Sequence, residues 1–145
     1  MSTGFDLAAP HVIELSVLPE DIDAYGHVNN AVYLTWLDRA AWSHSAALGV
    51  PLEQCIALRR GMAAQRIEIE YLRAALSGDV VQAATWIVSA DARLRAQRRF
   101  QVRRVVDGAT LARARIDYVC INLDSGRATR MPEVFARAYV ATVGG

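Results

Sequence analysis

The stretch D-I-D-A-Y-G-H-V-N-N-A-V-Y-L-T-W, residues 21–36, joins a turn to the start of a long helix. Two aspartates and a glycine precede a pair of asparagines, and an apolar-periodic segment follows them. Asparagine is a preferred N-cap because its side chain accepts a hydrogen bond from an unpaired N–H of the first helical turn. The sequence therefore predicts that the Asp23 carboxylate lies near a helix N-terminus, where free N–H groups and the helix dipole favour negative charge.

The predicted helix spans Asn30 to Leu48. Gly49 and Pro51 end it, because glycine accepts the left-handed capping conformation and proline cannot continue a helix. The residues that recur at helical spacing, and so share one face, are Tyr33, Trp36, Leu37, Ala40, His44, Ala47 and Leu48.

Strand-like segments surround this helix in the sequence. One precedes it at Val12–Leu18, a helical turn is predicted at 51–58, and a short helix after Pro132. Four further strands are predicted around 66–71, 80–89, 94–106 and 110–123, with a short fifth strand after the turn at 124–126. A helix followed by successive strands joined by hairpins predicts an α+β domain, with a curved antiparallel sheet wrapped around the long central helix over residues 1–145.

Composition narrows the possible functions. The chain has 145 residues, a net charge of +1 and 53% hydrophobic residues. These values exclude disorder, give no sign of a nucleic-acid partner, and are consistent with a buried subunit interface. We expect no membrane segment, no signal peptide and no cofactor. We also expect no metal site, because Cys55 and Cys120 lack ligand-type spacing. A cytoplasmic location is therefore the expectation.

The same stretch resembles a known family. Asp23, Tyr25, His27, Val28, Asn29, Asn30, Tyr33 and Leu34 match the D-x-Y-x-H-V-N-N-x-x-Y-L segment of bacterial long-chain acyl-CoA thioesterases. These enzymes belong to the 4-hydroxybenzoyl-CoA thioesterase branch of the hotdog fold. Plant acyl-ACP thioesterases carry a similar H-V-N-N-x-x-Y-x-x-W run, whose last position is matched by Trp36. The resemblance implies a hotdog fold, a homodimer or homotetramer, and hydrolysis of an acyl-CoA or acyl-ACP thioester.

The resemblance also implies roles for the catalytic residues. Asp23 is the expected catalytic carboxylate, and it either attacks the thioester carbonyl or activates water. A thiol has a pKa of about 8.5 and leaves without strong acid assistance. The backbone N–H groups around Asn29 and Asn30 are the expected oxyanion donors. His27 either assists, by orienting Asp23 or contacting the substrate carbonyl, or packs at the start of the helix.

The candidates for substrate binding are residues other than these catalytic ones. Tyr25 occupies the position of an asparagine in the plant enzymes, which argues against a triad-like role there. Tyr33, Trp36 and Leu37 are predicted to form the core or to line the acyl pocket, near which no polar group is evident. We therefore expect a preference for medium or long acyl chains over acetyl or aromatic ones.

Charged residues elsewhere are weaker candidates. Arg127 and Arg130 near the final turn are candidates for the phosphates of coenzyme A. Most arginines of a basic run at 93–104 are predicted to form a solvated face. Some of them are further candidates for contacts with the phosphates. Asp21 is expected to accept a hydrogen bond within the turn. Asp38 is expected either to form an ion pair or to support the catalytic residues. The basic run comprises Arg93, Arg95, Arg98, Arg99, Arg103 and Arg104.

Rival functions remain open at this point. A hotdog 3-hydroxyacyl dehydratase would need a histidine and an acid in segments where this chain does not show them. A non-catalytic acyl-binding protein on the same fold is distinguished only by the presence of Asp23 in its motif. An α/β-hydrolase serine is disfavoured, because the chain has no G-x-S-x-G sequence.

Overall fold

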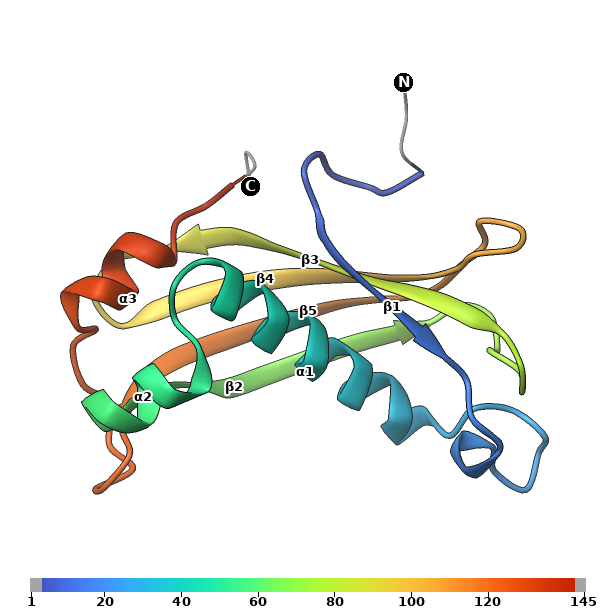
Figure 1. The fold of residues 1–145 in the computed structure, drawn as a ribbon, viewed down its shortest axis with the longest axis horizontal. Coiled ribbons are helices and arrows are strands. Elements are labelled where there is room, and N and C mark those ends of the chain that lie inside the picture. Colours follow the sequence, from blue (N-terminus) through green and yellow to red (C-terminus); the bar gives the residue numbers. More distant parts are fainter. Residues whose placement is uncertain (1–3, 143–145) are drawn as a thin grey trace.

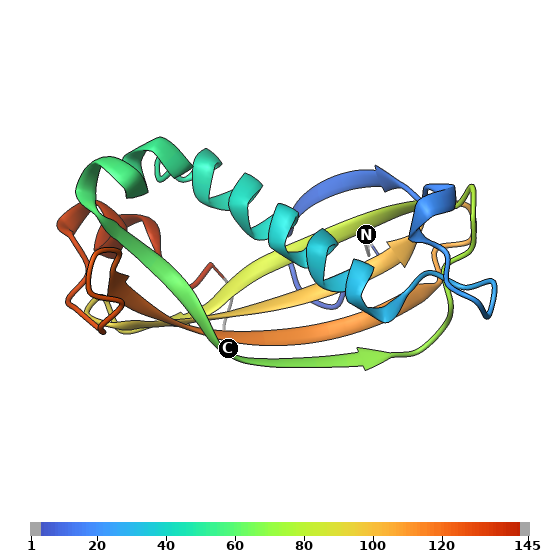
Figure 2. The same cartoon turned by 90° about the horizontal axis from the view of Figure 1, so that it is seen from below.

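The computed structural model of the protein describes residues 4–142, in which one antiparallel sheet curves around a helix (Figures 1 and 2). The strand order is β1-β3-β4-β5-β2, and helix α1 lies across one face of the sheet. This confirms the predicted α+β hotdog architecture. The strands are β1 (His11–Ser16), β2 (Arg60–Tyr71), β3 (Val80–Ala90), β4 (Arg95–Arg104) and β5 (Thr110–Asn122). The helices are the 3₁₀ turn η1 (Pro19–Asp21), α1 (Asn30–Ala47), α2 (Leu52–Leu58) and α3 (Glu133–Ala138).

Helix α1 forms where the sequence predicts it. Asn29 is the N-cap, and its side-chain oxygen accepts a hydrogen bond from the Ala31 N–H at 2.9 Å. The helix ends one residue earlier than predicted, at Ala47, because Leu48 is the capping residue and Gly49 follows with φ of +93°. The side chains buried against the sheet recur every three to four residues, and they are Tyr33, Trp36, Leu37, Ala40, Ala41, His44 and Ser45.

The strand register shows which side chains lie on the inner face of the sheet. Arg98 on β4 pairs with Ile87 on β3 and with Ile116 on β5, and Ile116 pairs with Ile67 on β2. Paired residues in an antiparallel sheet project to the same face. Arg98 therefore lies in a row of isoleucines that faces α1, with only 4% of its surface exposed.

The outer face is covered at its centre by the N-terminal segment 4–10. Phe5 and Leu7 pack against the buried outer cluster of Ala84, Trp86 and Val88. The indole N–H of Trp86 donates to the Ala8 carbonyl at 2.9 Å. This segment closes part of a sheet face that would otherwise expose a tryptophan to water.

Three sequence predictions need correction. The strand predicted around 94–106 ends at Arg104, and Val106 is 86% exposed in the hairpin turn. The short strand predicted after residues 124–126 is only an isolated bridge between Ile121 and Ala128. In the basic run, predicted to be mostly a solvated face, Arg93, Arg95 and Arg99 are exposed, whereas Arg98 is buried and points inward. None of the helices within residues 4–142 is both long enough and apolar enough to cross a membrane.

Candidate active site

The turn that carries Asp23 is held by its own backbone. The Asp23 N–H donates to the His27 carbonyl at 2.8 Å, and the Gly26 N–H donates to the Asp23 carbonyl at 3.0 Å. Gly26 has φ of +77°, a conformation that a residue without a Cβ adopts at little cost. The Tyr25 N–H donates to Oδ1 of Asp23 at 2.9 Å. Oδ2 of Asp23 makes no hydrogen bond within residues 4–142, so one carboxylate oxygen is available to a substrate or a water.

The same turn leads directly into the N-terminus of α1. The Asn29 N–H donates to the Asp21 carbonyl at 2.8 Å, and Ile22 bridges Val28 across the turn. Within the described residues, the Asn30 N–H has no protein acceptor. A free N–H at a helix N-terminus attracts an anion or a developing oxyanion. The segment therefore combines a partly exposed carboxylate with an unsatisfied donor a few residues away.

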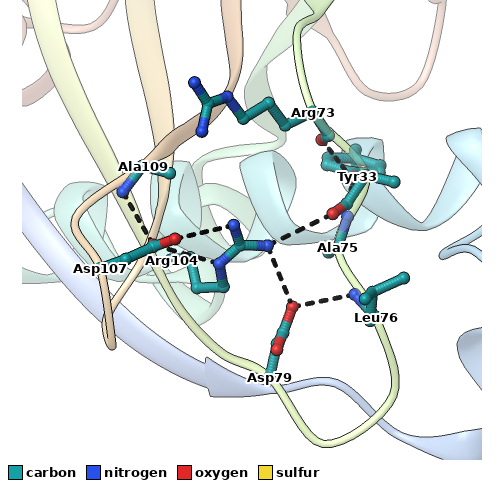
Figure 3. Close-up of polar contacts among 9 residues, drawn as sticks. Tyr33, Arg73, Ala75, Leu76, Asp79, Arg104, Asp107 and Ala109 are labelled. Carbon is teal, nitrogen blue, oxygen red and sulfur yellow. Dashed lines mark hydrogen bonds and ion pairs between the residues drawn. The ribbon is translucent and has the colours of Figure 1, made fainter.

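The loop between β2 and β3 contacts Tyr33 near the start of α1 (Figure 3). The Val28 N–H donates to the Ala75 carbonyl at 3.0 Å, and the Ala75 N–H donates to the hydroxyl of Tyr33, also at 3.0 Å. The Tyr33 hydroxyl also lies 3.5 Å from the Arg73 carbonyl, which accepts its proton. Tyr33 thus links the first turn of α1 to the loop that anchors Val28.

Arg104 fixes the other side of that loop, as Figure 3 shows. Its guanidinium lies 2.9 Å from Asp107 in the β4–β5 turn and 3.5 Å from Asp79 in the β2–β3 loop. Oδ2 of Asp79 in turn accepts the Leu76 N–H at 2.9 Å. The sequence analysis did not predict this network, because its members come from the β2–β3 loop, the end of β4 and the β4–β5 turn.

The predicted site residues have different environments. The His27 side chain is exposed and makes no hydrogen bond within residues 4–142, so a role in orienting Asp23 stays a prediction. Tyr25 is 87% exposed. Trp36 and Leu37 are 3% and 1% exposed in the core beneath α1. Asp21 accepts the Leu18 N–H through Oδ2 at 2.9 Å, as expected of a turn acceptor.

The two predicted phosphate ligands lie away from this segment in the same chain. Arg127 and Arg130 are exposed in the stretch after β5, beyond a turn whose Asp124 forms an ion pair with Arg59 at 2.8 Å. Arg59 follows α2, which comes after the C-terminal end of α1, whereas Asp23 precedes the N-terminal end. Figure 1 shows these two ends of α1 on opposite sides of the molecule.

Two cavities follow α1 along a face next to the core stripe. The first, of about 290 Å³, begins at Ala31 and includes Leu34, Thr35 and Asp38. The second, of about 300 Å³, continues past Ala41, Trp42 and Ser45 toward the helix C-terminus. Both are lined by Asp38, Ala64 and Tyr118, so they adjoin each other. Tyr33, Trp36 and Leu37 line neither of them, and their packing is that of core residues.

The second cavity ends at a cluster of buried polar side chains that the sequence analysis missed. Nη1 of Arg98 lies 2.7 Å from Nδ1 of His44, which accepts its proton. His44 also stacks on His11 with ring centroids 4.9 Å apart. Burial, followed by the neighbouring Arg98 and His11, lowers the pKa of His44 to about 4. His44 is therefore neutral at physiological pH and serves as a hydrogen-bond acceptor.

A prediction about acid stability follows from His44. Its folded-state pKa lies below the value near 6.5 expected in the unfolded chain, so the unfolded state takes up a proton first as the pH falls. Between pH 7.5 and 5.5 this group should remove about 1.4 kcal/mol from the free energy of unfolding. Urea denaturation at both pH values should show the loss, and His44→Gln, which keeps an acceptor for Arg98, should reduce it. Equal losses in the two proteins would contradict the prediction.

Comparisons with known proteins agree with the fold and name the family. The sequence pattern of the thioesterase-like superfamily matches residues 17–139. A hypothetical protein of Thermus thermophilus has a similar structure, with 25% identity, a TM-score of 0.81, and coverage of 89% of this chain and 96% of its own. Among curated protein sequences, none matches this chain.

Two further solved structures share the fold. A 1,4-dihydroxy-2-naphthoyl-CoA thioesterase from Synechocystis has 22% identity and a TM-score of 0.80, with 90% of this chain and 96% of its own covered. A Staphylococcus aureus protein solved in complex with CoA has 19% identity and a TM-score of 0.83, with 96% and 90% covered. The antiparallel sheet that curves around α1 is the architecture of a hotdog protein. By the extent of the family match, the chain belongs to the thioesterase-like superfamily.

Proposed function

We propose that the protein hydrolyses acyl-CoA thioesters, as a member of the 4-hydroxybenzoyl-CoA thioesterase branch with the H-V-N-N sequence. The observation that carries the proposal is the free Oδ2 of Asp23 beside a helix N-terminus whose Asn30 N–H lacks an acceptor. Membership of the thioesterase-like superfamily supports thioester hydrolysis as the type of reaction. The CoA bound to a structural relative supports CoA as the carrier.

The proposed reaction places the thioester carbonyl oxygen at the Asn30 N–H. In one route, Oδ2 of Asp23 attacks the carbonyl carbon, the C–S bond breaks, and the thiolate leaves to give a mixed anhydride that water then hydrolyses. In the other, Asp23 takes a proton from water while the water oxygen attacks the carbonyl carbon, and the C–S bond then breaks to release the thiolate and the carboxylic acid. In both routes the backbone donor stabilises the negative charge on the carbonyl oxygen.

The activity is tested by release of free thiol from acyl-CoAs of graded chain length and from the corresponding acyl-ACPs. Hydrolysis of the CoA series supports the proposal. Preference for acyl-ACP would mean that the carrier is ACP and not CoA, with the same hydrolysis reaction. Binding of these thioesters without thiol release would point to a non-catalytic acyl-binding protein.

We further propose that the protein works as a homodimer or a larger homo-oligomer joined through β2. This strand is an edge of the sheet and is twice as long as the other edge, β1, with 12 residues against 6. An open edge offers unpaired N–H and C=O groups to a second copy. Apolar side chains lie partly exposed on and near it, with Ile67 at 41%, Tyr71 at 43% and Trp42 at 44%.

Two-fold antiparallel pairing of β2 would bring distant residues to the site. The Tyr71 hydroxyl donates to the Asn30 carbonyl at 3.0 Å, so the C-terminal end of β2 adjoins the start of α1. The partner would place the beginning of its own β2, and the nearby residues 124–130, beside that end. Arg127 and Arg130 would then serve the site of the other subunit.

Activity should therefore depend on assembly. We expect specific activity to fall by about tenfold or more on dilution below the dimer dissociation constant, since the monomer lacks the partner's contribution. Sedimentation velocity at the same concentrations gives the fraction of dimer. A monomer with full activity at assay concentration would refute the dimeric site without affecting the role of Asp23.

A further inference from the structure

Arg98 is a cation in the interior that no acid neutralises. It is 4% exposed on the face of β4 that α1 covers. Its three hydrogen-bond partners are neutral, with Nη1 bonded to His44 at 2.7 Å and to Thr85 at 3.3 Å, and Nη2 bonded to Ser45 at 3.2 Å. No carboxylate forms an ion pair with it in the stretch from residue 4 to 142. An arginine keeps its charge at neutral pH, so its burial without a counter-charge is energetically unfavourable.

The Nε and Nη2 edge of the Arg98 guanidinium is largely free in the described part of the chain. In other arginines of this protein, the same edge binds a carboxylate. The Nε of Arg98 makes no hydrogen bond within residues 4–142, and Nη2 makes one. Through Nε and Nη2, Arg113 binds Asp6 at 2.6 and 3.0 Å. Arg104 binds Asp107 through the same two nitrogens at 3.1 and 2.9 Å. A planar guanidinium edge of this kind fits a carboxylate with two parallel hydrogen bonds.

Arg98 lines the cavity of about 300 Å³ beneath the second half of α1. This cavity adjoins the one that starts at Ala31, one residue after the free Asn30 N–H. A linear ligand could therefore run along α1 from the candidate catalytic segment to the guanidinium. Between the two ends the lining is largely apolar, with Ala41, Ala64 and Ile116.

We propose that Arg98 binds a carboxylate at the far end of the acyl group, so that the substrate is a thioester of a dicarboxylic acid. This rests on the proposed thioester hydrolysis at Asp23. The Arg98 guanidinium contacts His44 and Ser45, so about fourteen residues of α1 separate it from the Asn30 N–H, roughly 21 Å at ~1.5 Å per residue. An extended chain advances ~1.2 Å per bond, so an acyl group of about sixteen to eighteen carbons spans this distance.

Asp38 lies where the two cavities meet, and it is the acid that the ligand would pass. It is exposed and forms no ion pair with Arg98. Surrounding residues nevertheless desolvate part of its carboxyl group, which raises the pKa of Asp38 and makes its charge less favoured than that of an ordinary aspartate. Because Asp38 faces the apolar middle of the chain in this arrangement, it leaves the guanidinium to the terminal carboxylate.

The experiment compares hexadecanedioyl-CoA with hexadecanoyl-CoA, two thioesters that differ only at the far end. We expect the wild-type kcat/KM to favour the dicarboxylic thioester by about tenfold or more, as for a charge-assisted hydrogen bond gained. Arg98→Met should lower kcat/KM for hexadecanedioyl-CoA by about 30-fold while changing that for hexadecanoyl-CoA by less than about threefold. Arg99→Met is the matched control, because Arg99 is exposed on the opposite face of β4, and it should change neither.

Binding of thioether analogues, which cannot be hydrolysed, to the wild-type protein keeps the test independent of how Arg98→Met folds. Calorimetry should show S-(15-carboxypentadecyl)-CoA binding about tenfold more tightly than S-hexadecyl-CoA. Hydrolysis of both thioesters with no preference, together with equal binding of the two thioethers, overturns the role of Arg98 but not the proposed function. Preferential binding of the carboxyl-terminated thioether, with no hydrolysis of either thioester, upholds the Arg98 site and refutes the proposed function.

Discussion

Asp23→Asn should lower kcat by about a thousandfold or more while leaving the protein folded. Loss of a catalytic carboxylate removes several kcal/mol of transition-state stabilisation, and each ~1.4 kcal/mol is a factor of ten in rate. The turn should survive, because the amide oxygen of asparagine can still accept the Tyr25 N–H that Oδ1 accepts at 2.9 Å. Thiol release under saturating substrate measures the effect.

Asp21→Asn is the matched control for this prediction. Asp21 lies in the same loop, and its carboxylate accepts the Leu18 N–H at 2.9 Å. The substitution removes the same charge two residues away and should change kcat by no more than a few-fold. Near-normal turnover in Asp23→Asn, or similar losses in both variants, would show that the carboxylate of Asp23 is not the catalytic group.

Leu37→Ala should reduce the free energy of unfolding by about 3 kcal/mol. The Leu37 side chain is 1% exposed in the core between α1 and the sheet, and a Leu→Ala change in such a core typically costs 2–5 kcal/mol. Leu34→Ala makes the same change one turn earlier, at a partly buried side chain that lines the first cavity.

The two leucines should separate packing from substrate binding. Leu34→Ala should cost clearly less stability than Leu37→Ala, and it should raise KM for a long acyl-CoA because apolar contact area is lost. Urea denaturation and steady-state kinetics on both variants test this. A loss of under about 1 kcal/mol in Leu37→Ala, or an unchanged KM in Leu34→Ala, would contradict the assignment of these two helix faces.

The fold could be predicted because its signals are local. The cap at Asn29, the stop at Gly49 and the spacing of Tyr33, Trp36 and Leu37 each act within a few residues of sequence. Periodicity also identified most of the buried stripe of α1, although Ala47 is exposed and Ala41 and Ser45 are buried. It could not show that the space for a ligand lies along the neighbouring stripe at Leu34, Asp38 and Trp42, because empty volume depends on what the sheet places opposite each stripe.

The candidate site could be predicted only in part, for a similar reason. The segment from Asp23 to Asn30 is continuous, so its turn and its free N–H follow from nearby residues. Arg98 and Arg99 are adjacent and chemically identical, and strand alternation sends one inward and the other outward. Which one faces α1 depends on the pairing of β4 with β3 and β5, and no short stretch of sequence contains that information.

The N-terminal segment over the outer face of the sheet bears on how this protein should be produced. Phe5 and Leu7 shield Trp86, and Asp6 holds Arg113 at 2.6 Å. A shortened form that starts after Pro10 would carry a bare apolar strip on its convex surface, which is the kind of patch that promotes aggregation. Its poor yield could then be mistaken for instability of the turn that carries Asp23. Work on the enzyme should therefore retain residues 4–10.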